Sequence, residues 1–105
     1  MDMECNNITR LVLPAIRINI AEQLEHKYKL NQKEISYRLG VAQVAVSKYL
    51  SGNYSGSLRK VASQVKESGL VDAMVGKAAK INDPKAIDMM VNDLCSKFVN
   101  HDLVN

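Results

Sequence analysis

Residues 32–52 read QKEISYRLGVAQVAVSKYLSG, and this stretch decides the fold. Asn31, just before it, is a good helix N-cap, and Glu34 stands three residues later, in the capping-box position. Gly40 predicts the end of this first helix, because glycine adopts the left-handed backbone conformation at little cost. A second helix is expected over about 43–50. The stretch therefore predicts two short helices joined by a tight turn, a helix-turn-helix unit.

The apolar spacing in this unit separates a buried side from an open side. Ile35 and Leu39 are four residues apart and face one side of the first helix. Ser36 is small where the two helices are expected to pack, and Val46 and Tyr49 form the buried stripe of the second helix. A helix of this size fits the major groove of B-DNA, where its N-terminal residues meet the base edges. The residues left on its open faces are Gln43, Val44, Ser47 and Lys48.

The region before this unit also has a helical pattern. Ile16, Ile20 and Leu24 recur at four-residue spacing, and Pro14 suits the first turn of such a helix, where its missing N–H is not needed. Whether Ile8, Leu11 and Val12 form an earlier helical turn stays open.

Helical signals continue after the unit, and strand signals are scarce. Residues 53–57 have loop chemistry, and the following helix is expected to end at Gly69. Residues 70–80 are predicted to be helical, and Asp83-Pro84 opens a final helix. We therefore expect an all-α protein of five or six short helices. The apolar stripe of the final helix is Ile87, Met90, Val91, Leu94 and Phe98.

Composition fits one small domain over residues 1–105. The chain has 105 residues, of which 47% are hydrophobic and 24% are charged, and it has no Trp. Cys5 and Cys95 are the two cysteines, which is no disulfide framework and favours a reducing, cytoplasmic setting. No apolar run approaches the roughly 18 residues of a membrane span, so we expect no membrane partner.

Positive charge is concentrated in residues 31–60, where five basic residues stand against Glu34 alone, a net charge of +4. Residues 81–105 carry a net charge of −2. A basic segment beside an acidic one favours a surface that faces a polyanion, although a charge excess is more often only a solvated face. The five basic residues are Lys33, Arg38, Lys48, Arg59 and Lys60.

Residues 32–52 resemble the helix-turn-helix of the phage-repressor and Cro-like regulators. With LPAIR at 13–17 and VSKYLSG at 46–52, the chain is also similar to small archaeal predicted transcriptional regulators. The resemblance implies a lambda-repressor-like fold, with a DNA-binding head over 14–68 and a C-terminal helical extension over 70–105. Ser36 replaces the usual Ala, and Ala42 stands where Thr, Ser or Gly is frequent, so the second helix lacks a side-chain cap.

The resemblance also implies roles for individual residues in binding double-stranded DNA. Gln43 is the leading base reader, because its amide can pair with an adenine edge, and Val44 is placed to touch a thymine methyl. Gln32 is expected to contact phosphate and to brace Gln43. The full set of implied DNA contacts is Gln32, Lys33, Gln43, Val44, Ser47, Lys48, Ser51 and Asn53.

Several functions have no signal in the residues. Cys5, Cys95, His26 and His101 lack the spacing of metal ligands. No nucleophile–base arrangement or phosphate-cradling glycine loop is present, so we expect neither an enzyme nor a cofactor. Two alternatives to a sequence-specific regulator stay open: a protein-interaction or antitoxin-like module of the same fold, and a nonspecific architectural DNA binder.

We also expect a homodimer, because one recognition helix spans only a few base pairs and a specific site usually has two half-sites. The expected seam is the final helix, through its stripe of Ile87, Met90, Leu94 and Phe98.

Overall fold

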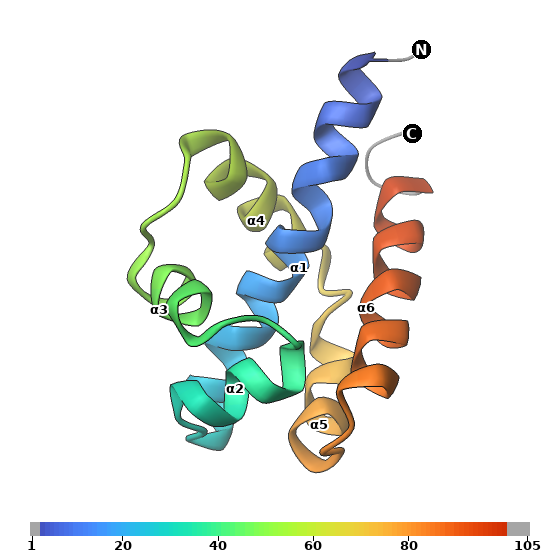
Figure 1. The fold of residues 1–105 in the computed structure, drawn as a ribbon. Helices are drawn as coiled ribbons and strands as arrows, with labels where there is room; N and C mark the ends of the chain where they lie inside the picture. Colours follow the sequence, from blue (N-terminus) through green and yellow to red (C-terminus); the bar gives the residue numbers. More distant parts are fainter. Residues whose placement is uncertain (1–2, 101–105) are drawn as a thin grey trace.

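The computed structural model describes the backbone of residues 3–100 and the side chains of residues 10–100. This part of the chain is entirely helical and contains no strand, which confirms the all-α prediction. The six helices, drawn in Figure 1, are α1 (Met3–Tyr28), α2 (Gln32–Leu39), α3 (Gln43–Ser51), α4 (Gly56–Ser68), α5 (Asp72–Lys80) and α6 (Pro84–Phe98).

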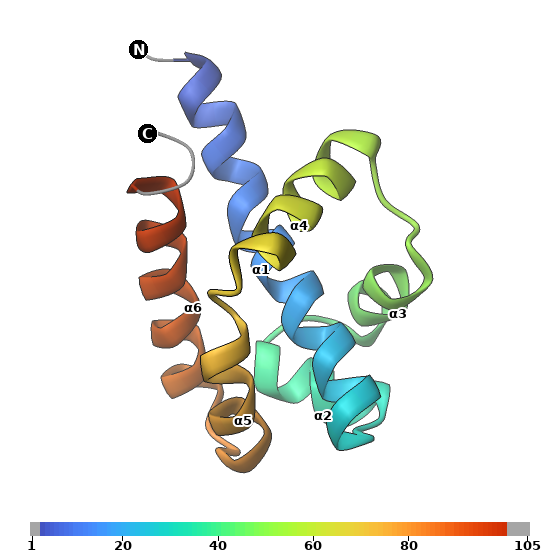
Figure 2. The ribbon, with the colours of Figure 1, turned by 180° about the vertical axis from the view of Figure 1, so that it is seen from behind.

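Helix α1 is the central element, and all five other helices pack against it. In both views, α3 and α4 lie on one side of α1 and α6 lies on the other, whereas α2 packs against both α3 and α6 (Figures 1 and 2). Buried Asn19 joins α1 to α4, because its Nδ2 donates to the carbonyl oxygens of Ala15 at 2.9 Å and Ala62 at 3.0 Å. This arrangement explains why α1 buries apolar residues around most of its circumference.

The length of α1 corrects the prediction that Pro14 stands in a first turn. The helix has 26 residues and runs through Pro14, so it is neither short nor opened by the proline. A proline inside a helix costs about 3 kcal/mol, because it has no N–H to donate and its ring crowds the preceding turn. Val12, Ile16 and Ile18 around it are fully buried, and each such side chain contributes about 1.5–3 kcal/mol. Tertiary burial therefore outweighs the local cost.

The helix-turn-helix unit begins and ends as the sequence predicts. Glu34 N donates to Asn31 Oδ1 at 2.8 Å, and Asn31 N donates to Glu34 Oε1 at 2.9 Å, which completes the capping box. Gly40 ends α2 with a φ of 66°, in the left-handed region. Helix α3 follows at once and extends to Ser51, one residue beyond the predicted end.

The C-terminal helices also follow their local signals. Ser55 caps α4, which therefore begins at Gly56, inside the predicted loop over 53–57. Asp83 caps α6 by accepting a hydrogen bond from Lys85 N at 3.1 Å. In α5, a Cβ on Gly76 would lie 3.2 Å from Tyr28 Oη, so the glycine allows the end of α1 to approach closely.

All six helices contribute to one hydrophobic core, and this corrects the expected dimer seam. Ile87, Leu94 and Phe98 of α6 belong to this core and are at most 8% exposed. Met90 is half-buried against the same core. The stripe of α6 covers the side of α1 away from α3, so Ile87, Leu94 and Phe98 are used within the chain and are not free to form the seam.

None of the helices in the described residues combines the length and the apolar composition that a membrane span requires.

Candidate nucleic-acid interface

Helix α3 presents one buried side and one open side. Val46 is fully buried and Tyr49 is half-buried against the core, as the spacing predicts. Val44 is 63% exposed, although it is apolar. Helix α6 lies across α1 from α3 and does not cover it (Figures 1 and 2). The exposed residues of α3 include all four that the spacing placed there: Gln43, Val44, Ser47 and Lys48.

The first turn of α3 forms without a side-chain cap. Ala42 takes the extended N-cap conformation, with φ −69° and ψ 152°, and its carbonyl accepts from the amides of Ala45 and Val46. The missing cap is the departure noted in the sequence. Gln43 and Val44 therefore occupy the exposed first turn, where the amides have no intrahelical acceptor.

Helix α2 packs against α3 and contributes the exposed residues Gln32 and Lys33 at its first turn. Ser36, between the two helices, is buried, and its Oγ donates to Lys33 O at 2.9 Å. Within the described residues, no hydrogen bond joins Gln32 to Gln43, so the expected bracing of the base reader is absent from this structure. Both glutamine amides are left with free hydrogen-bonding capacity.

The loop after α3 is held in place by α4. The Arg59 guanidinium donates from Nη2 to Gly52 O at 2.8 Å and lies 5.0 Å from the centroid of the Tyr54 ring. Asn53 N donates to Lys48 O at 3.0 Å, which fixes the backbone beside two exposed residues, Ser51 and Asn53. No local sequence pattern signals this bracing role of Arg59.

The basic segment seen in the sequence is only partly available to a ligand. The Arg38 guanidinium donates to the carbonyls of Ala78, Ala79 and Glu34, so it caps the end of α5. Arg59 is engaged with the loop. Lys33, Lys48 and Lys60 are exposed. The exposed positive charge of this segment is therefore carried by these three lysines and by Arg59, whose guanidinium also holds the loop.

No group of three or more His, Cys, Asp or Glu residues in the described part of the chain could hold a metal ion. His26 is exposed, whereas His101 and the side chain of Cys5 lie outside the described residues. Burial raises the pKa of the Cys95 thiol, and the nearby positive charge of Arg17 opposes this effect. A raised pKa keeps this thiol protonated and unreactive near neutral pH.

Comparison of this chain with protein-family models, curated proteins and solved structures gave no match. The function is therefore inferred from the geometry and chemistry of the residues.

Proposed function

We propose that this chain is a sequence-specific transcriptional regulator that binds double-stranded DNA and reads the major groove with α3. The supporting observation is the open side of α3, which directs four adjacent side chains to solvent while Val46 anchors the helix in the core. The proposal retains the resemblance to the Cro-like and small archaeal regulators with a lambda-repressor-like domain. Regulation would follow from occupancy of an operator, with no chemical step and no cofactor.

The proposed contacts divide into base reading and phosphate binding. Gln43 would read an adenine edge with its amide, and Val44 would contact a thymine methyl. Ser47 and Lys48 reach bases or phosphates one turn further along α3. Phosphate contacts fix the orientation of the protein on the duplex without carrying sequence information. We assign those contacts to Gln32, Lys33, Ser51 and Asn53, all of which are exposed around α3.

A regulator of this size would bind as a homodimer, because two half-sites about one helical turn apart give more specificity than one. With the apolar stripe of α6 buried, the remaining candidate seam is a groove of ≈ 730 Å³ between α5 and α6. Leu70, Met89 and Met90 line the groove, and Met89 is 73% exposed. Helix α6, which forms one wall of this groove, lies across α1 from α3 (Figures 1 and 2), so a seam there would leave both recognition helices uncovered.

The alternative function is a protein-interaction module of antitoxin-like type that does not read bases. One observation favours it: Tyr37 of α2 and Val44 of α3 are 55% and 63% exposed, and a protein partner would remove these large apolar side chains from water. In this reading, the open side of α3 would bind another protein, and the lysines would be solvated surface charges.

Selection of bound sites from random duplexes, combined with a salt titration, tests the proposal. A sequence-specific regulator enriches one motif and loses affinity as the salt concentration rises. Salt-dependent binding without an enriched motif would replace the proposal with a nonspecific architectural binder. Absence of binding at low salt would favour the interaction module.

A further inference from the structure

A hollow lies where α1, the end of α2 and the start of α6 meet, and we name it the junction hollow. Its volume is ≈ 510 Å³, within the range of roughly 300–1,000 Å³ that is common for small-molecule sites. Arg17, Lys85 and Asp88 provide its charged lining, and Leu39, Pro84 and Met89 provide its apolar lining.

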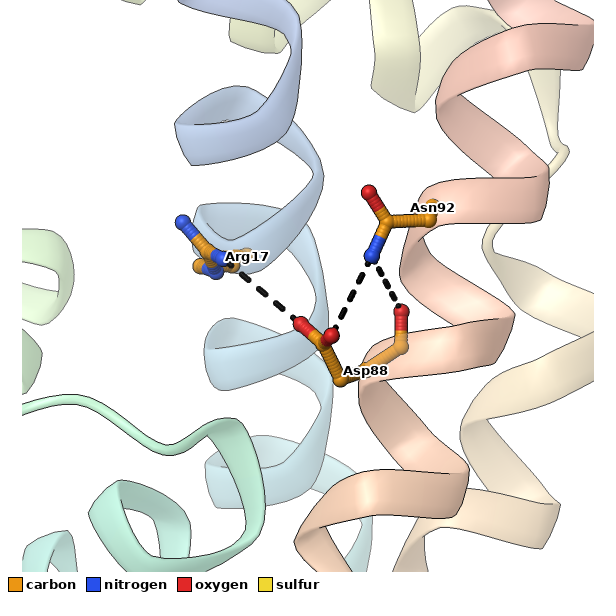
Figure 3. Close-up of polar contacts among 3 residues, drawn as sticks. All are labelled: Arg17, Asp88 and Asn92. Atoms are coloured by element: carbon orange, nitrogen blue, oxygen red, sulfur yellow. Dashed lines mark hydrogen bonds and ion pairs between the residues drawn. The ribbon is translucent and has the colours of Figure 1, made fainter.

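Arg17 has unused hydrogen-bonding capacity in this hollow. Its side chain is 25% exposed, and its one ion pair in the described residues is a long contact of 3.9 Å from Nη2 to Asp88 Oδ1 (Figure 3). A guanidinium has five N–H donors in a planar fork that matches a carboxylate. Arg38 shows the contrast, because three of its nitrogens donate to backbone carbonyls. Arg17 is therefore a half-buried cation without a close partner.

Asp88 does not neutralise the positive charge that lines the hollow. Its side chain is 58% exposed, and Oδ2 accepts a hydrogen bond of 3.3 Å from Asn92 Nδ2, which also donates to the Asp88 carbonyl oxygen at 2.8 Å (Figure 3). Asn92 thus holds the carboxylate along α6. Two cations, Arg17 and Lys85, line the hollow against this one anion. An additional negative charge between the cations would be electrostatically favourable.

The apolar lining indicates what else the ligand carries. Leu39 is 6% exposed and Pro84 is half-buried, so together they offer an apolar wall. An aliphatic chain placed against this wall would be shielded from water on one side, while its charged head would remain at Arg17. An inorganic anion would contact only the two cations and would leave the apolar lining of the hollow without a contact.

We propose that the junction hollow binds a small aliphatic carboxylic acid. Its carboxylate accepts paired hydrogen bonds from the Arg17 guanidinium and a further contact from Lys85. Its aliphatic body packs against Leu39 and Pro84. Gly40, which begins the turn between α2 and α3, also lines the hollow. Binding itself does not depend on the proposed DNA function, and it is measured on the free protein.

Titration of the full-length, isotopically labelled chain with hexanoate tests this site by NMR. We expect saturable shifts of the Gly40 and Asp88 amides, with a Kd on the order of 1 mM. Acetate should bind about tenfold more weakly, because it lacks the aliphatic body, and 1-hexanol should cause no saturable shift, because it lacks the charge. Absence of saturable hexanoate shifts, or equal shifts with 1-hexanol, would overturn the proposal.

Three variants identify the head-group contact. Arg17→Gln should abolish the hexanoate shifts, whereas Lys97→Gln, which removes a cation from the far end of α6, should leave them unchanged. Asp88→Asn should tighten binding, because the competing carboxylate is lost from an exposed position. This variant keeps the test decisive even if Arg17→Gln disturbs the fold. Unchanged or weaker binding by Asp88→Asn would contradict the assignment to Arg17.

Discussion

The Arg38 guanidinium of α2 donates from Nε to the carbonyl oxygen of Ala78 in α5 at a distance of 3.2 Å. A second donation, from Nη2 to Ala79 O at 3.3 Å, covers the next carbonyl of the same helix end. The positive charge lies at the negative end of the α5 dipole, where it is stabilising. One side chain therefore connects the helix-turn-helix unit to the C-terminal helix pair.

We expect Arg38→Ala to lower the free energy of unfolding by about 1–3 kcal/mol, because half-buried carbonyls at the end of α5 lose a charged donor. Lys33→Ala removes the same charge from the same helix at an exposed position, and it should change stability by less than about 0.5 kcal/mol. Urea unfolding of both variants measures the difference. Equal stability of the two variants would show that the Arg38 contacts contribute nothing.

Gln43→Ala should cost about 1–3 kcal/mol of binding free energy on the selected site and relax the preference at one base pair. The loss is specific because the amide both donates to and accepts from one adenine edge. Repeating the site selection with the variant measures this change. Gln64→Ala, on the exposed surface of α4, is the matched control and should leave the selected motif unchanged. An unaltered motif with Gln43→Ala would mean that α3 does not read that base.

Lys48→Ala distinguishes charge from base reading. If Lys48 contacts a phosphate, its loss should weaken binding to all sequences alike and reduce the salt slope by about one unit. If Lys48 reads a guanine, the loss will concentrate at one position of the site. Lys97→Ala, on α6 across α1 from α3, is the control and should change neither the affinity nor the salt slope. Affinity measured at four salt concentrations decides between these outcomes. No effect of Lys48→Ala on any duplex would remove it from the interface.

Met89→Asp should convert a dimer to a monomer, because it places a charge in the groove between α5 and α6 without touching the core. Met89 is 73% exposed, so the variant is expected to keep its fold. Sedimentation at micromolar concentration measures the change, and tight operator binding should be lost while nonspecific binding persists. Ser96→Asp adds the same charge at another exposed position of α6 and is expected to remain dimeric. A monomeric wild type, with and without DNA, would refute the dimer.

The turn between α2 and α3 depends on the backbone conformation of Gly40. Its φ is 66°, and a Cβ there would meet no atom within 4 Å, so the cost of Gly40→Ala is conformational and about 1–2 kcal/mol. Gly56 also has open space but lacks a positive φ, so Gly56→Ala should be neutral or stabilise by up to about 1 kcal/mol. Thermal unfolding compares the two variants, and similar costs would contradict the conformational explanation.

The sequence by itself determined both ends of α2, the start of α6 and the open side of α3. These helix ends are set by contacts within a few residues, so their signals can be recognised without the fold. The residues concerned are Asn31 with Glu34, then Gly40, and then Asp83 before Pro84. The exposure of Gln43 and Lys48 follows in the same way from the helical period.

Only the tertiary structure decided how these helices are used. Helix α1 runs through Pro14 because neighbouring helices bury the residues on either side of it. The apolar stripe of α6 belongs to the hydrophobic core and not to a dimer seam, because α1 lies against it. The Arg38 guanidinium binds carbonyls at the end of α5 and is therefore not free for a polyanion. Each of these outcomes depends on residues far apart in the chain. Local helix propensity cannot predict such contacts, because their stabilising energy arises only after the helices pack.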